Sequence, residues 1–156
     1  MRIEGKALCL PQDIDTDVII AGRYLRTKDR KLWAVHAFED LDPGIAPRLA
    51  GAVIVAGKNF GCGSSREQAA IALREAGVAG IVAPSFARIF FRNAVNVGLP
   101  VVECDCPCTD NTLVVAELEE GYVEMGGSRI PARKLSPRMI GILKAGGLVD
   151  FWRASH

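Results

Sequence analysis

The sequence has almost no net charge, since 19 Lys and Arg residues stand against 18 Asp and Glu residues in a chain of 156. This balance gives no electrostatic reason to expect nucleic acid or an anionic membrane surface as a partner. Long hydrophobic runs are also missing, and no apolar stretch approaches the ~18 residues of a transmembrane helix. We therefore expect a globular protein that binds neither nucleic acid nor membranes.

Histidine is scarce, because His36 and the terminal His156 are the only two. A Ser-His-Asp triad would have to use His36, and the G-x-S-x-G turn that carries the nucleophile in many hydrolases is absent. The Gly61-Cys62-Gly63 run also lacks the third glycine, and the lysine followed by serine or threonine, that phosphate-binding loops contain. Neither a serine hydrolase nor a nucleotide-binding protein is favoured.

The five cysteines are an odd number, and no apolar segment of the kind found in signal peptides follows residues 1–6. Both features predict a cytoplasmic protein with free thiols rather than a disulfide framework. Cys104, Cys106 and Cys108 could bind zinc or part of an iron–sulfur cluster, but the C-x-C spacing is tighter than the usual C-x-x-C and a fourth ligand is needed. A cysteine-rich strand end is the favoured interpretation, and a cysteine-based metal-binding module is the alternative.

The length suits a single domain, residues 1–156, with a substantial core. Weak alternation predicts a first strand over residues 2–10. Three further strands are expected near residues 52–56, 80–83 and 99–103, with helices between them. Each of these strands is continuously apolar at its centre, which is typical of parallel strands covered on both faces. We therefore predict an α/β fold with a central, mostly parallel sheet flanked by helices.

The remaining segments carry weaker patterns. Residues 31–41 have a helical pattern, and residues 113–118 and 122–125 resemble the two strands of a hairpin. A helix is expected over residues 136–147, because the segment opens with Ser-Pro and closes with Gly-Gly. Residues 148–151 are expected to form a closing strand.

The stretch Gly57–Ala70 joins the apolar run 52–56 to an alanine-rich helical pattern. Its glycines permit positive φ and the close approach of a ligand. The spacing from Ser64 to Glu67 matches the S-x-x-E capping box, which would start the helix at Ser64. Unpaired N–H groups and the positive dipole end at a helix start bind anions. Arg66 opposes that dipole, which favours an arriving anion over a capped helix without further function.

Two charged segments each permit two interpretations. Asp13, Asp15 and Asp17 alternate like cation ligands, but the glycine and glutamate of a calcium loop are missing. We therefore favour acids that cap and brace a turn. Residues 21–31 hold five basic residues. They form either a solvated surface loop or a mobile loop that reaches over an anionic substrate.

A further helix pattern begins after Ser85, which is expected to cap it. Its Arg88 and Arg92 are four residues apart and lie on one face. A solvated face is favoured over a ligand site for this pair.

Several segments, in order along the chain, resemble a known family. They are Asp15–Asp17, Tyr24–Thr27, Asn59–Glu67 and Ser85–Asn93, the last continued by Gly98–Pro100. Together they resemble the small subunits of 3-isopropylmalate dehydratase and homoaconitase, which correspond to the swivel domain of aconitase. The resemblance covers nearly the whole chain and implies a swivel-like β/β/α domain.

The resemblance also implies an activity. It is that of the small subunit of a two-chain hydro-lyase that isomerises 2-isopropylmalate and 3-isopropylmalate by dehydration and rehydration in leucine biosynthesis. The alternatives within the family are a homoaconitase subunit and a dimethylmalate or citraconate hydratase subunit. The implied partner is a large subunit, in a heterodimer or heterotetramer, whose cysteines hold a 4Fe-4S cluster. This chain would then need no cofactor of its own, would be inactive alone, and would act on a hydroxylated di- or tricarboxylate.

The roles of the family's Gly-Ser-Ser-Arg motif fall on three residues here. Ser64 is the implied catalytic base, which removes the proton α to a carboxylate. Ser65 is the implied hydrogen-bond donor to the substrate. Arg66 can bind a substrate carboxylate with both arms of its guanidinium.

The segment Leu25, Arg26 and Thr27 matches the family's loop that contacts the variable part of the substrate. The charge of Arg26 suits a distal carboxylate, as in homoaconitate. Leu25 and the aliphatic stem of Arg26 suit an isopropyl group instead. Both interpretations stay open on the sequence.

Overall fold

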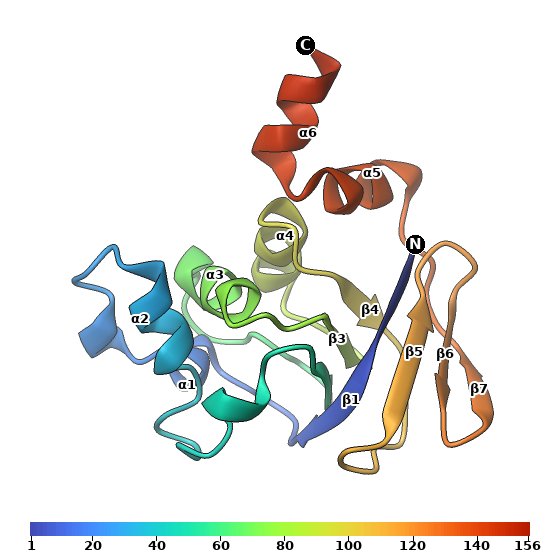
Figure 1. Ribbon diagram of the computed structural model, residues 1–156, viewed down its shortest axis with the longest axis horizontal. Helices are drawn as coiled ribbons and strands as arrows, with labels where there is room; N and C mark the ends of the chain where they lie inside the picture. Colours follow the sequence, from blue (N-terminus) through green and yellow to red (C-terminus); the bar gives the residue numbers. More distant parts are fainter.

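A seven-stranded sheet runs through the computed structural model, which describes residues 1–156 (Figure 1). Its spatial order is β4-β3-β2-β1-β5-β6-β7. The strands are β1 Arg2–Leu10, β2 Val53–Ala56, β3 Gly80–Ala83, β4 Val101–Glu103, β5 Leu113–Glu117, β6 Tyr122–Met125 and β7 Ser128–Pro131. The helices are α1 Thr16–Ile19, η1 Gly22–Tyr24, α2 Arg30–Val35, η2 Ala46–Arg48, α3 Glu67–Glu75, α4 Arg88–Asn96, α5 Pro137–Ala145 and α6 Leu148–Ser155.

The sheet is mixed, so the expectation of a mostly parallel sheet holds for one half only. Strands β1 to β4 pair in parallel, in a register that sets Ala7 opposite Val53 and Val53 opposite Gly80. Strands β5, β6 and β7 continue the sheet from β1 in antiparallel pairs. The short turns after β5 and β6 explain the difference, because a parallel pair needs a crossover of a dozen or more residues.

The parallel half is the most deeply buried part of the sheet. Every residue of β2 and β3 is buried, as the continuous apolar runs predicted. Helices α3 and α4 are the crossovers that connect β2 to β3 and β3 to β4. Figure 1 shows the helices gathered on one side of the strands, and 41 buried residues form one continuous core.

The helical pattern of residues 31–41 is only partly realised. Helix α2 ends at Val35, and the chain then turns tightly through residues 36–42. Phe38 has a φ of 60° and its N–H donates to Ile19 O at 2.9 Å. This long-range bond takes the backbone out of the helical path, and it fixes the turn that carries Glu39 and Asp40.

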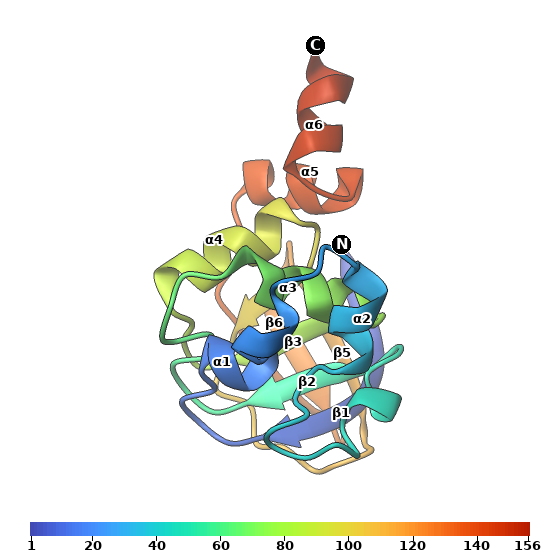
Figure 2. The ribbon, with the colours of Figure 1, turned by 90° about the vertical axis from the view of Figure 1, so that its left-hand side faces the viewer.

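The C-terminal segment differs from its prediction. Helix α5 begins as expected, with Ser136 Oγ accepting from Met139 N–H at 3.2 Å. The closing strand over residues 148–151 is wrong, because these residues open helix α6 instead. Leu148 and Phe151, one helical turn apart, pack against the core, while α6 projects away from the body of the molecule (Figures 1 and 2). A segment of four residues, three of them apolar, is too short to distinguish a strand from a helix by periodicity.

One disulfide corrects the expectation of free thiols. Cys9 on β1 is bonded to Cys108, with 5.9 Å between their Cα atoms and 99 residues between them in sequence. The segment after β4 runs along β1 here, since Asn111 N–H donates to Ala7 O at 2.8 Å. Three free thiols remain, those of Cys62, Cys104 and Cys106. None of the helices has the length and apolarity to span a bilayer.

Candidate functional site

The turn between β2 and α3 is built on residues with positive φ: Asn59 (62°), Gly61 (83°) and Gly63 (89°). Glycine is required at the last two positions for space as well as for conformation. A Cβ on Gly61 would collide with the ring of Phe90, and one on Gly63 would collide with the carboxylate of Asp15. The turn is therefore packed tightly against its neighbours and is held in one shape.

Residues 14–16 brace this turn from one side. Gly61 N–H donates to Ile14 O at 2.7 Å, and Thr16 N–H donates to Cys62 O at 2.9 Å. The buried Thr16 also donates its hydroxyl to Ser64 O at 2.8 Å. The turn's shape is thus set by a segment that contacts it directly, although Thr16 and Ser64 are 48 residues apart in sequence.

The alternating acids act as the bracing interpretation predicted. Asp15 is the N-cap of α1 and accepts from Asp17 N–H at 2.7 Å. Asp13 accepts from the amide of Asn59 at 3.0 Å. No group of three acidic, cysteine or histidine side chains is placed to hold a metal ion.

The segment before α4 supports the other side of the turn. Ser85 Oγ accepts from Asn59 N–H at 2.8 Å, and Ala87 N–H donates to Phe60 O at 2.9 Å. The prediction that Ser85 caps α4 is therefore wrong. The N-cap of α4 is Ala87, which offers no side-chain bond.

Helix α3 starts later than the capping box predicted. It begins at Glu67, and its N-cap is Arg66, in an extended conformation and without a capping side chain. The hydroxyl of Thr16 donates to the Ser64 carbonyl, which a helix beginning at Ser64 would use for its first intrahelical bond. The hydroxyls of Ser64 and Ser65 make no hydrogen bond within the protein, and both residues are exposed. They are free to meet a ligand.

Arg66 connects three parts of the site. Its Nη1 lies 2.5 Å from Asp17 Oδ1, and its side chain is 23% exposed. This Nη1 is buried and makes no aligned hydrogen bond, so the contact with Asp17 is an ion pair. Gly22, at the start of η1, lies directly beside it, since a Cβ there would stand 3.7 Å from Nη1. The guanidinium thus sits between the turn, α1 and η1.

A cavity of about 220 Å³ opens at the turn. Its lining contains two arginines, two serines and a threonine but no carboxylate; the residues are Thr16, Gly61, Gly63, Ser64, Ser65, Arg66, Ala87, Arg88, Ile89 and Phe90. Arg88 and Arg92 are both exposed, as a solvated face predicts, and Arg88 also contributes to the lining of this cavity. Arg88 is the first residue of α4, so it too is a cation set against a helix dipole.

A larger hollow of about 500 Å³ lies between α4, β4 and α5 and shares Arg88 with this cavity. It contains neither Ser64 nor Ser65. The chemistry available to a substrate is therefore concentrated at the smaller cavity.

The residues Leu25, Arg26 and Thr27 do not line the cavity. Leu25 is half-buried against the core, and Thr27 Oγ1 accepts from Asp29 N–H at 3.1 Å. Arg26 is exposed and has no ion-pair partner. The segment approaches the site at Gly22, three residues before Leu25. A Cβ on Gly22 would stand 3.7 Å from Arg66 Nη1.

The free cysteines are poor nucleophiles. Burial, and then the charges of Asp15 and Asp13, raise the pKa of Cys62. Burial raises the pKa of Cys104 to about 11. Together with the oxidation of Cys108, this leaves the cysteine-based metal-binding module without converging ligands.

The class that these features define is a mixed α/β domain with two unbonded hydroxyls and two arginines at a glycine turn between a strand and a helix, an arrangement that suits a small anion. The comparisons give this class a family. The aconitase C-terminal domain model matches residues 12–105. The chain belongs to this family, and within it to the group of small subunits of 3-isopropylmalate dehydratase and homoaconitase.

Relatives of this group match along nearly the full chain. The 3-isopropylmalate dehydratase small subunit 1 of Methanopyrus kandleri is 51% identical over 95% of this chain and 91% of its own length. The methanogen homoaconitase small subunit of Methanothermobacter thermautotrophicus is 44% identical over 96% and 90%. A crystal structure of 3-isopropylmalate dehydratase from Methanocaldococcus jannaschii superposes with a TM-score of 0.93 at 40% identity, over 99% of this chain and 95% of that one. The swivel-like fold expected from the resemblance is confirmed.

Proposed function

We propose that this chain is the small subunit of a two-chain hydro-lyase that interconverts 2-isopropylmalate and 3-isopropylmalate. The observation that carries the proposal is the cavity at which the unbonded hydroxyls of Ser64 and Ser65 meet Arg66 and Arg88, with no carboxylate in the lining. Such a site suits a carboxylate substrate. The 51% identity to a 3-isopropylmalate dehydratase small subunit supports the same assignment.

Ser64 is the proposed base. Its hydroxyl has no competing partner, and it stands two residues before the N-cap of α3, whose positive dipole end favours an anion. Arg66 adds a second positive charge. Both effects stabilise the alkoxide that must take the proton from the carbon α to a carboxylate. The hydroxyl on the neighbouring carbon then leaves, and water adds back with the opposite orientation.

Arg66 is the proposed carboxylate binder, since its planar guanidinium can hold both oxygens of a carboxylate. To do so it exchanges its ion pair with Asp17 for one with the substrate. Ser65 donates a hydrogen bond to the same substrate. Arg88 adds a further positive charge to the cavity lining.

The departure of the hydroxyl needs an acid that these residues do not provide. A 4Fe-4S cluster would supply a Lewis acid there. This chain has no set of cysteines that fits such a cluster, because Cys9 and Cys108 are bonded to each other and Cys104 and Cys106 are buried. We therefore assign the cluster to a large subunit, in keeping with the relatives' designation as small subunits.

A homoaconitase subunit is the second candidate. The unpaired, exposed Arg26 favours it, because its charge suits the extra carboxylate of homoaconitate. The 44% identical methanogen relative points the same way.

The deciding experiment is reconstitution with the cluster-bearing large subunit from the same source. The purified chain alone is expected to turn over no substrate. With the partner, hydration and dehydration are followed at the ultraviolet absorbance of the alkene, for 2-isopropylmalate, homoaconitate, dimethylmalate and citraconate in parallel. A reconstituted complex that acts on none of the four would overturn the proposal, whereas a preference for homoaconitate would select the second candidate.

A further inference from the structure

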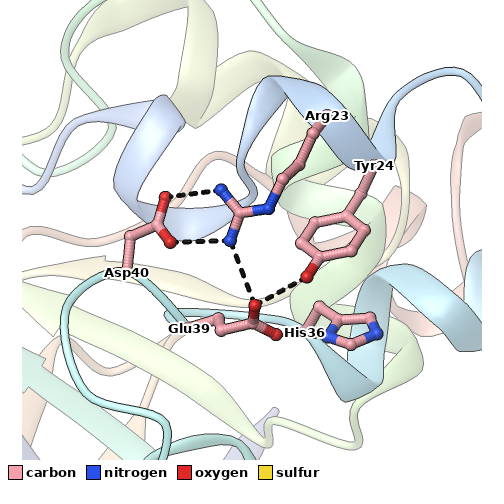
Figure 3. Close-up of polar contacts among 5 residues, drawn as sticks. All are labelled: Arg23, Tyr24, His36, Glu39 and Asp40. Atoms are coloured by element: carbon pink, nitrogen blue, oxygen red, sulfur yellow. Dashed lines mark hydrogen bonds and ion pairs between the residues drawn. The ribbon is translucent and has the colours of Figure 1, made fainter.

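A network of polar contacts joins η1 to the turn that follows α2 (Figure 3). Glu39 is its centre. Its Oε1 accepts from the Tyr24 hydroxyl at 2.6 Å and from Arg23 Nη2 at 3.0 Å. Its Oε2 contacts His36 Nδ1. The imidazole of His36 in turn stacks on the ring of Tyr24, with 4.2 Å between centroids.

Asp40 belongs to the network at its margin. It accepts two hydrogen bonds from Arg23, at 2.7 and 3.1 Å, and it contacts neither Tyr24 nor His36. Glu39 therefore contacts Arg23 and Tyr24 on η1 and His36 at the end of α2, whereas Asp40 contacts only Arg23 (Figure 3). This asymmetry lets a change at Asp40 separate the contact with Arg23 from the contact with Tyr24.

The carboxyl of Glu39 stays ionised at neutral pH and well into the acid range. The hydrogen bond from Tyr24 is the main cause, followed by those of His36 and Arg23, and together they lower the pKa of Glu39 to about 2. A charged acceptor makes shorter and stronger hydrogen bonds than a neutral one. The network therefore depends on the charge of Glu39 as well as on its shape.

The turn that presents Glu39 is rigid. Its backbone is tied to the end of α1 by the bond from Phe38 N–H to Ile19 O. Tyr24 has a second attachment, because the buried Trp33 donates its indole N–H to Tyr24 O at 2.9 Å. The short η1 has no side-chain cap and no buried residue of its own. Its position is consequently set by Trp33 on the backbone, by Glu39 on Tyr24 and Arg23, and by Asp40 on Arg23 alone.

The position of η1 matters to the cavity. Gly22, its first residue, lies beside the guanidinium of Arg66, since a Cβ there would stand 3.7 Å from Nη1, and Arg26 follows the last residue of η1 by two positions. A shift of η1 would move the wall behind Arg66 and would also change where Arg26 stands relative to it.

We infer that Glu39 is a positioning residue for the substrate site: through Tyr24 and Arg23 it holds η1 in register with Arg66, and it thereby sets how the protein discriminates hydroxy-acid substrates by their distal substituent. This inference rests on the proposed function of the Ser64–Arg66 turn. Glu39 itself touches no residue of the cavity lining, so its effect on substrate passes through η1.

The kinetic test compares Glu39→Gln, which keeps the shape and removes the charge, with Asp40→Asn in the reconstituted holoenzyme. Glu39→Gln is expected to raise KM about tenfold with kcat changed less than about threefold, the pattern of lost ground-state positioning. It is also expected to change the ratio of kcat/KM between 2-isopropylmalate and homoaconitate. Asp40→Asn loosens Arg23 but not Tyr24, so it is expected to raise KM less than Glu39→Gln does. The distant Glu75→Gln is the control and is expected to stay within about twofold of wild type, as surface charge changes do.

A double-mutant cycle identifies the route. Tyr24→Phe removes the hydroxyl that donates to Glu39, so it should reproduce the direction of Glu39→Gln. Because the two residues act through one contact, the double variant should be little worse than Glu39→Gln alone. Additive losses would overturn the inference, as would an equal fall of kcat and kcat/KM with KM unchanged.

A second readout is independent of turnover. The amides of Tyr24 and Leu25, which donate to Ala21 O and Gly22 O, report the order of η1 by hydrogen exchange. They are expected to exchange about tenfold faster in Glu39→Gln but not in Glu75→Gln. Unchanged exchange overturns the inference whatever the kinetics show. Faster exchange in a holoenzyme that acts on neither substrate overturns the proposed function instead, and keeps the role of Glu39 in placing η1.

Discussion

Asp17 Oδ1 lies 2.5 Å from Arg66 Nη1, so the arginine beside Ser64 is already paired within the protein. Asp17 is the more exposed partner, at 57% against 23% for Arg66. A carboxylate that enters the cavity therefore finds a guanidinium that is held in place by a counter-charge in contact with solvent. The exchange of one carboxylate for another costs less than the desolvation of an unpaired arginine would.

Asp17→Asn tests this counter-charge. The substitution leaves the buried Nη1 without an anion, so the free energy of unfolding should fall by about 1 kcal/mol. Urea denaturation of the chain alone measures it. Asp29→Asn is not a suitable control because Asp29 caps α2, whereas Asp105→Asn removes an exposed acid that has no ion pair. An equal effect of both substitutions would contradict the role of the pair.

Ser64→Ala should separate catalysis from folding. The Ser64 hydroxyl makes no bond within the protein, so the melting temperature should not change. Loss of the base should lower kcat of the holoenzyme by roughly 10²–10⁴-fold, the range typical of general base catalysis. Ser65→Ala is the matched neighbour and should act mainly on KM. Near-normal turnover in Ser64→Ala would contradict the assignment of the base.

Thr16→Val should lower both the stability of the fold and the turnover of the holoenzyme. Thr16 donates its hydroxyl to Ser64 O, and valine has nearly the same shape without the donor. The lost hydrogen bond should cost about 1–2 kcal/mol of unfolding free energy, because a partly buried carbonyl is left unpaired. The freed turn should also lower kcat. Thr112→Val, at a half-buried threonine whose hydroxyl makes no hydrogen bond, should do neither.

These bonds also explain how far the sequence could lead. The buried strands β2 and β3 and the helices α3 and α4 were predicted because apolar runs and periodicity are local properties. The candidate site at Ser64 and Arg66 was predicted from the glycine turn and from the family resemblance, and it stays a prediction. The N-cap of α3 was predicted two residues too early, at Ser64 instead of Arg66, and the carbonyl of Ser64 accepts from the hydroxyl of Thr16, 48 residues earlier in sequence, where a capping box would have it accept the first intrahelical bond.

Other features depend on contacts that no local pattern contains. The bond between Cys9 and Cys108 requires the segment after β4 to return along β1. Helix α6 replaces the expected strand, and Leu148 and Phe151, one helical turn apart, pack against the core beside α5. Glu39 carried no signal in the sequence, since its partners come together only when η1 meets the turn after α2.

Reduction of the disulfide should destabilise the chain. It closes a loop of about 100 residues, and the loss of that constraint on the unfolded state should cost about 3–4 kcal/mol. The measurement is urea denaturation with and without dithiothreitol. A Cys9→Ala, Cys108→Ala double variant should match the reduced wild type and should not respond to the reductant. A response in the double variant would assign the effect to another thiol.

Acid should unfold the protein through two glutamates in particular. Hydrogen bonds lower the pKa of Glu39 to about 2, chiefly from Tyr24, and that of Glu119 to about 2, chiefly from Lys144, against an ordinary value of 4.5. A carboxyl whose pKa is lower in the folded state stabilises the protein fully above its unfolded pKa, and the contribution is lost as the pH falls through the folded value. The melting temperature should therefore fall as the pH is lowered from about 4.5 to 2.

Three variants test this acid limb of the curve of melting temperature against pH. Glu39→Gln and Glu119→Gln should each flatten the limb and lower the melting temperature at neutral pH. Glu75→Gln, at an exposed glutamate without an ion pair, should leave the curve unchanged. If the acid limb kept its slope in both variants, carboxyls elsewhere in the chain would have to carry the pH dependence.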